Sequence, residues 1–189
     1  MSAILLVGPA SEPWTLAEVK SFLRVEHDAD DAVITALLAA ARGQVEALTR
    51  RALLLQSWRL ALDRWPADGR LVLRIAPLRA VTAARVFDAA GVAHPIDPSG
   101  FVVDAAANAI AAPRCSLPQP GRAHAGIELD LQLGFGAAAG DVPEQLRHAI
   151  RTLVAHWYDN RGLAAIGQSV ALLPGSVSAM IASYRVLSL

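Results

Sequence analysis

Apolar residues recur at three- and four-residue steps in three parts of the chain, which places them along one face of a helix. The clearest repeat spans 142–161, after Asp141, a residue type that favours a helix start, and before Gly162, which favours a helix end. Pro143 falls in the first turn, where a missing N–H costs no helical hydrogen bond. The pattern predicts a helix whose core face holds Val142, Leu146, Ala149, Ile150, Leu153, Val154 and Trp157.

The same spacing predicts two more helices nearer the N-terminus, over 15–24 and 31–50. Thr15 and Glu18 have the spacing of a capping box at the start of the first helix. Residues 1–13 contain two prolines, and we expect them to form an irregular arm. The core face of the second helix is expected to hold Ile34, Leu37, Leu38, Ala41, Val45 and Leu48.

Between the helices the apolar period falls to two, the period of a strand. No helical pattern separates the strands, which excludes a doubly wound parallel sheet and favours antiparallel pairing. We therefore predict an α+β chain, an antiparallel helical body with a β-rich insertion and an extended C-terminal arm. Its expected parts are the N-terminal arm and first helices (1–53), the β-rich insertion (54–140), the main helix (141–162) and the C-terminal arm (163–189).

The C-terminal arm is strongly apolar but has no long periodic element. Pro174 is placed to open one short helix there. An arm of this composition either packs on its own core or is completed by another protein. We expect it to be mobile in the free subunit and to order on a partner.

Formal charge is zero over 189 residues, which argues against a nucleic-acid binder that relies on bulk positive charge. The charge is nevertheless segregated, with six acids in 1–31 and nine arginines in 42–85. These segments are either ordinary solvated faces or complementary flanks of neighbouring copies. On the second interpretation the inter-subunit residues are Asp28, Asp30, Asp31, Arg42, Arg50 and Arg51.

No apolar run approaches the length of a membrane span, and the opening residues lack the basic region of a signal peptide. We therefore expect a soluble protein that is not exported. The single cysteine, Cys115, excludes an intrachain disulfide and is assigned no role.

Three motifs suggest chemistry, and each has a simpler explanation. The acids at 26–31 resemble a calcium loop without its glycine and distal glutamate, so helix capping by Asp28 or Asp30 is favoured. The glycines at 134–140 are one residue too widely spaced for a dinucleotide loop. His148 and His156 lack the four-residue spacing of metal ligands on a helix. We predict no catalytic, cofactor or metal site, and hence no enzyme.

Several segments together resemble one known family. They are TLAEVKSFLRV, DADDAVITALLAAARGQVEALTRRALLLQSWRLALDRWP, IAPLRAVTAARVFDAAG, GFGAAAGDVPEQLRHAIRTLVAHWYDNRG and LPGSVSAMIASYRV. In this order they resemble the head–tail connector (adaptor) proteins of tailed phages, prophages and gene transfer agents. The likeness covers nearly the whole chain, about residues 9–186. The segments that carry the most weight are HWYDNRG and the run from Thr49 to Leu53 followed by Trp58.

The resemblance implies a structural protein of the virion or gene transfer agent particle, assembled in the host cytoplasm. Members form rings, most often twelvefold, between the portal protein and a stopper or tail-terminator protein. Double-stranded DNA passes through the lumen with non-specific contact, and neither a membrane nor a cofactor takes part. The portal-facing candidates are Leu172, Leu173, Val177, Met180, Ile181 and Tyr184.

Two alternatives remain open. The chain could be a different ring protein, namely a stopper or tail-completion protein. It could also be a nucleotide-binding enzyme that uses the glycine loop at 134–140. Whether the particle is a phage or a gene transfer agent also stays open.

Overall fold

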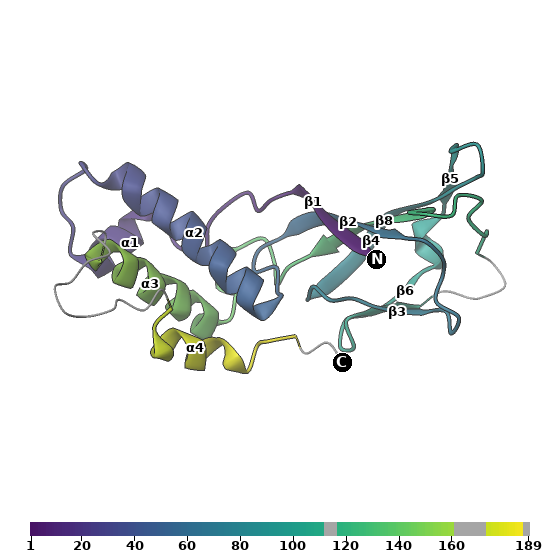
Figure 1. Cartoon of the computed structure of the whole chain (residues 1–189). Coiled ribbons are helices and arrows are strands. Elements are labelled where there is room, and N and C mark those ends of the chain that lie inside the picture. Colours follow the sequence, from purple (N-terminus) through teal and green to yellow (C-terminus); the bar gives the residue numbers. More distant parts are fainter. Residues whose placement is uncertain (112–116, 161–172, 187–189) are drawn as a thin grey trace. The chain divides into compact units, whose positions relative to one another are not determined.

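The computed structural model describes residues 1–111, 117–160 and 173–186. Two compact units make up the chain (Figure 1). The sheet unit contains residues 1–9 and 55–135, and the helical unit contains residues 10–54 and 136–189. Helices and antiparallel strands occur together, so the predicted α+β class is confirmed.

In its described residues the helical unit contains four α-helices: α1 (Leu16–Leu23), α2 (Asp31–Thr49), α3 (Glu144–Asp159) and α4 (Gly175–Ala182). α2 packs along α3, and α4 packs on both (Figure 1). The predicted capping box of α1 is confirmed. The Glu18 amide donates to Thr15 Oγ1 over 3.3 Å, and the Thr15 amide donates to Glu18 Oε2 over 2.7 Å.

Trp14, just before α1, links this end of the chain to α3. Its indole Nε1–H donates to the Arg147 carbonyl over 2.8 Å. The Arg147 guanidinium lies 3.9 Å from the centre of the Trp14 ring, a cation–π distance. Arg151 lies near the rings of both Trp14 and Phe22, at 4.9 and 5.1 Å. Two arginines of α3 thus contact Trp14, which precedes α1, and one of them also contacts Phe22 of α1.

The buried stripe of α2 differs slightly from the prediction. Leu37 and Leu48 are only half-buried, whereas the polar residue Thr49 is fully buried. Its hydroxyl donates to the Val45 carbonyl over 2.7 Å, which satisfies the polar group inside the core. The fully or nearly fully buried positions of the helix are Ile34, Leu38, Ala41, Val45 and Thr49.

By length and composition alone α2 is long and apolar enough to cross a membrane, contrary to the expectation from the sequence. Its apolar stripe, however, is buried in the helical unit, where α2 packs against α3. Beside this stripe, Arg42 and Glu46, whose side chains are each 16% exposed, form an ion pair of 2.7 Å. These are the features of a core helix in a folded domain.

α3 begins and packs slightly differently from the prediction. Pro143 occupies the N-cap position, whereas the Asp141 carboxylate accepts from the Ala138 amide over 2.9 Å in the preceding 3-10 turn, Ala139–Asp141. Trp157 is only half-buried, because the buried stripe ends at Val154, one turn before the helix ends. The predicted stop at Gly162 lies outside the described residues.

Across its described ranges, 1–9, 55–111 and 117–135, the sheet unit contains two antiparallel sheets. The larger has the strand order β1-β2-β8-β4-β5 and the smaller has the order β3-β7-β6 (Figure 1). A short 3-10 turn, Pro98–Gly100, precedes β6. The strands are β1 (Ser2–Val7), β2 (Gln56–Leu62), β3 (Arg70–Val72), β4 (Leu78–Phe87), β5 (Ala93–Ile96), β6 (Val102–Asp104), β7 (Ala109–Ala111) and β8 (Ile127–Leu133).

Register in the larger sheet separates an apolar face from a charged face. Leu60 of β2 pairs with Leu129 of β8, and both side chains are buried. The adjacent positions on the opposite face pair Arg59 with Asp130. A slip of one residue would exchange the two faces, so burial of the leucines fixes this register.

The first residues form a strand rather than the irregular arm expected from their two prolines. Ser2–Val7 pairs antiparallel with β2 at the edge of the larger sheet. Both prolines lie after this strand, at positions 9 and 13, and therefore leave its amide groups intact. The strand belongs to the sheet unit and not to the helical body that follows it in sequence.

Candidate functional site

The acidic loop before α2 is held by the chain's own lysine. Lys20 Nζ lies 2.6 Å from Asp28 Oδ1 and 2.7 Å from Asp31 Oδ1. The hydrogen bond from Lys20 lowers the pKa of Asp28 below its ordinary value. In the described ranges no group of three His, Cys, Asp or Glu side chains could hold a metal ion.

The prediction that an aspartate side chain caps the start of α2 is wrong. Asp30 occupies the N-cap position but makes no capping hydrogen bond to the helix. Its carboxylate instead accepts from the Tyr158 hydroxyl of α3 over 2.6 Å. The side chain therefore ties α2 to the last turn of α3.

The glycine loop considered for a dinucleotide is filled by a carboxylate. A side chain at Gly136 would collide with the Asp141 carboxylate, which fixes the loop through the Ala138 amide. A negative charge at this place opposes a bound phosphate. On α3, His148 Nδ1 accepts from Arg151 Nε over 2.8 Å.

The three arginines predicted to lie between subunits differ in their contacts and exposure within one subunit. Arg42 lies 2.7 Å from both Glu12 and Glu46, with 16 % of its side chain exposed. Arg51 donates from Nε to the Tyr184 carbonyl over 2.6 Å. Arg50 is exposed at the end of α2, where it adopts a left-handed conformation with φ 55°.

The C-terminal segment is partly built into the helical unit. Val177 and Ile181 of α4 have no exposed surface, and the Val186 amide donates to the Thr49 carbonyl over 2.9 Å. Residues 175–182 are thus folded in the free subunit, contrary to the expected mobility of the whole arm. Leu172 lies outside the described residues, and the half-buried candidates are Leu173, Met180 and Tyr184.

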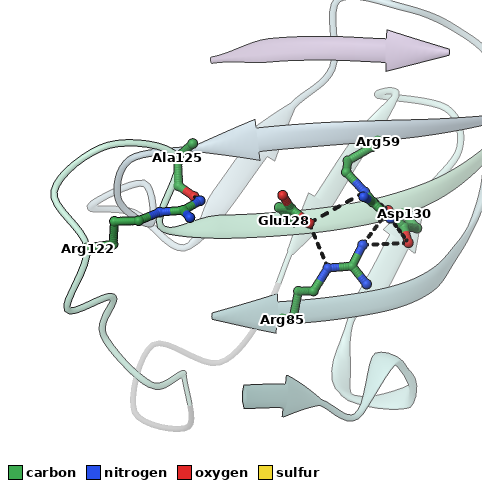
Figure 2. Close-up of polar contacts among 6 residues, drawn as sticks. All are labelled: Arg59, Arg85, Arg122, Ala125, Glu128 and Asp130. Carbon is green, nitrogen blue, oxygen red and sulfur yellow. Dashed lines mark hydrogen bonds and ion pairs between the residues drawn. The ribbon is translucent and has the colours of Figure 1, made fainter. Parts of the chain in front are cut away.

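A charged network that the residue pattern did not predict lies on the polar face of the larger sheet (Figure 2). Arg59 Nε lies 2.7 Å from Asp130 Oδ1, and Arg85 Nη2 lies 2.8 Å from Asp130 Oδ2. Arg85 Nε also lies 2.7 Å from Glu128 Oε2. The alternation of apolar and polar residues shows which side chains share a face. It does not show that β8 lies between β2 and β4, which is what brings these four side chains together.

Arg122 marks one end of β8 in the same view (Figure 2). Its guanidinium donates to the Ala125 carbonyl and lies 4.2 Å from the centre of the Phe87 ring. Arg59, Arg85 and Arg122 of the sheet unit therefore all have contacts inside the subunit. Two of them, Arg59 and Arg85, belong to the segment predicted as a basic flank, and their charges are compensated by Glu128 and Asp130.

The network makes the sheet unit sensitive to acid. Hydrogen bonds from Arg59 and then from Arg85 lower the pKa of Asp130, against the opposing effect of burial. This stabilisation is complete above the unfolded-state pKa of about 3.9 and is lost as the pH falls through the lower folded-state pKa. We expect the free energy of unfolding of the Asp130→Asn variant to lie below that of the wild type at neutral pH. The difference should close in acid, and a constant difference down to about pH 2 would show that the network contributes nothing through ionisation.

Comparison with known proteins gives one family and several solved structures. The family model described as phage gp6-like head–tail connector protein matches residues 13–73. A comparison with curated proteins finds no match.

Three solved structures are similar to the chain over its whole length. One is from the neck of an empty GTA particle computed with C6 symmetry, with 32% identity, TM-score 0.83 and coverage of 100% of this chain and 97% of that chain. A second is from the virion of a native gene transfer agent (GTA) particle, with 31% identity, TM-score 0.82 and the same coverage, 100% and 97%. A third is from the neck of a native GTA particle computed with C12 symmetry, with 30% identity, TM-score 0.75 and coverage of 100% and 97%.

Proposed function

Because the chain belongs to the head–tail connector (adaptor) family of tailed phages and gene transfer agents, we propose that it forms a closed ring that joins portal to tail. Its place is the head–tail interface of the particle. In the proposed ring a central channel lets double-stranded DNA pass. The observation that carries the proposal is whole-chain similarity to structures from particle necks with C6 and C12 symmetry.

The proposed role is structural rather than enzymatic. Cyclic symmetry requires that each subunit contact its neighbours through two different patches, since a head-to-tail interface closes a ring. One candidate pair of patches is the charged set Asp28, Asp30, Asp31, Arg42, Arg50 and Arg51. Asp28, with 89% of its side chain exposed, and the exposed Arg50 are the best placed to meet a neighbour. Exposed pairs contribute only about 0–1 kcal/mol each, but a ring repeats them.

We assign portal docking to the C-terminal segment, in which some residues pack on the subunit and others face the portal. Val177 and Ile181 fix α4 on the subunit and have no exposed surface to offer a partner. The docking surface that we propose therefore consists of Leu173, Met180 and Tyr184, together with Leu172. Partial exposure of Leu173, Met180 and Tyr184 leaves apolar area that a portal subunit can bury.

Deleting the gene and imaging the particles tests this function. We expect DNA-filled or leaking heads without tails, and we expect wild-type protein supplied in trans to restore tailed particles. The Arg50→Glu variant should restore fewer of them while the free subunit stays folded. Arg24→Glu is the matched control, because Arg24 is also an exposed arginine with positive φ at a helix end, 58° against 55°.

Two outcomes would contradict the proposal. Normal numbers of tailed, DNA-retaining particles without the gene would show that the chain is not the connector. Tails that stay joined to heads while DNA leaks would assign it to a stopper role instead.

A further inference from the structure

The outer strand β1 of the larger sheet is apolar and exposed on both faces. The exposed fractions are 56% for Ile4, 46% for Leu5, 42% for Leu6 and 62% for Val7. β1 pairs with β2 on one side, and in the described part of the chain no strand pairs with its other side. Folded proteins usually protect such an edge with charge, proline or a covering segment, since its free amide and carbonyl groups recruit another strand.

The opposite edge of the same sheet is protected in this way. β5 has four residues against six in β1, and it contains Pro95, which has no N–H to offer a further strand. β1 contains neither a charged residue nor a proline. One edge is therefore closed to a further strand, whereas the other is open to it.

An apolar pocket adjoins the open edge on the core face of the sheet. It measures about 140 Å³, and its lining includes Ala3, Trp58, Leu60, Leu73, Ile75 and Leu131. An apolar cavity of about 150 Å³ in another protein holds a benzene molecule, so this pocket has room for one large apolar side chain. Its lining spans β1, β2 and β8 and the residues after β3.

Register shows how the strand edge and the pocket would act together. Ala3 pairs with Leu60 and Leu5 pairs with Trp58, so these β1 side chains lie on the face that carries the pocket. Ile4 pairs with Arg59 and lies on the charged face. When an extended segment adds to a sheet edge, main-chain hydrogen bonds supply affinity and pockets for alternate side chains supply specificity. Both elements are present here.

We propose that β1 and this pocket receive an extended apolar segment of a second copy of the chain. The inference rests on the proposed ring and names one of its two contact patches. Two of the similar solved structures come from necks computed with C6 and C12 symmetry, so every copy in such an assembly has neighbours of its own kind. In a cyclic ring each subunit binds its neighbour through a patch that differs from the surface it meets. An open β1 edge that receives an extended segment of the next copy satisfies this requirement.

A photo-crosslinking amino acid incorporated in place of Ile4 tests the identity of the occupant. Particles that contain this variant are assembled first and then irradiated. The expected product is a covalent dimer of this chain, identified by mass spectrometry. The same residue in place of Val92, which is 55% exposed near the other edge of the sheet, is the control and should give no dimer. An adduct of position 4 with a different particle protein, or no adduct, overturns the proposal.

A charge at the edge provides the second test, in the gene-deleted producer. Ile4→Lys should lower the yield of tailed particles at least tenfold, because a lysine on an edge strand opposes pairing with another strand. Val92→Lys should leave the yield unchanged. Thermal unfolding of the free subunit should change little in either variant, since both side chains are already exposed and the like charge placed opposite Arg59 is a weak cross-strand effect. Wild-type yield from Ile4→Lys would overturn this inference but leave the connector function standing, which the gene deletion tests separately.

Discussion

Replacing Ile181 with alanine is expected to lower the free energy of unfolding of the helical unit by about 2–5 kcal/mol. Ile181 lies on α4 and has no exposed surface, and α4 packs on both α3 and α2. Truncation would leave a cavity that the surrounding helices fill only partly. Chemical denaturation of the free subunit, followed by far-ultraviolet circular dichroism, measures the loss.

Met180→Ala separates folding from docking. Met180 is the neighbour of Ile181 on α4 but is only half-buried, so its truncation should cost much less stability. It should nevertheless reduce attachment to portal-containing heads if this surface docks. If Ile181→Ala left the unfolding midpoint unchanged, α4 would not belong to the core of the free subunit. The whole C-terminal segment would then await its partner, as its sequence suggests.

Replacing Leu153 with alanine should be about as costly, again about 2–5 kcal/mol. Leu153 is fully buried at the centre of the apolar stripe of α3. Trp157 lies one turn further along the same face but is half-buried, so Trp157→Ala should cost less than Leu153→Ala despite the larger side chain. Equal losses, measured in the same denaturant titration, would return Trp157 to the core, where the periodicity alone had placed it.

Local signals predicted the helices because their causes lie within a few residues. The α1 capping box joins Thr15 and Glu18, three positions apart, and the structure has both of its hydrogen bonds. The stripe of α3 was predicted correctly from Leu146 to Val154, where the helix has neighbours to pack against. The same periodicity wrongly placed Trp157 in the core. Periodicity shows which face of a helix is apolar, but it does not show where the elements packed against that face end.

Non-local pairing decided what the sequence could not show. Ser2–Val7 forms a strand because it pairs with Gln56–Leu62, and no pattern within Ser2–Val7 predicts that pairing. Arg59 is neutralised by Asp130, 71 residues away, so counting charges along the chain overstated the basic flank. Likewise, the apolar C-terminal segment gave no sign that α4 would bury Val177 and Ile181 while leaving Met180 half-exposed.

The most direct test is a cryo-electron microscopy reconstruction of the neck in particles that carry this chain. We predict a closed ring of identical subunits next to the portal, with DNA on its axis and a neighbouring copy against β1. Density for this chain in the tail or the capsid shell, or a neck that lacks it, would contradict the proposed connector ring.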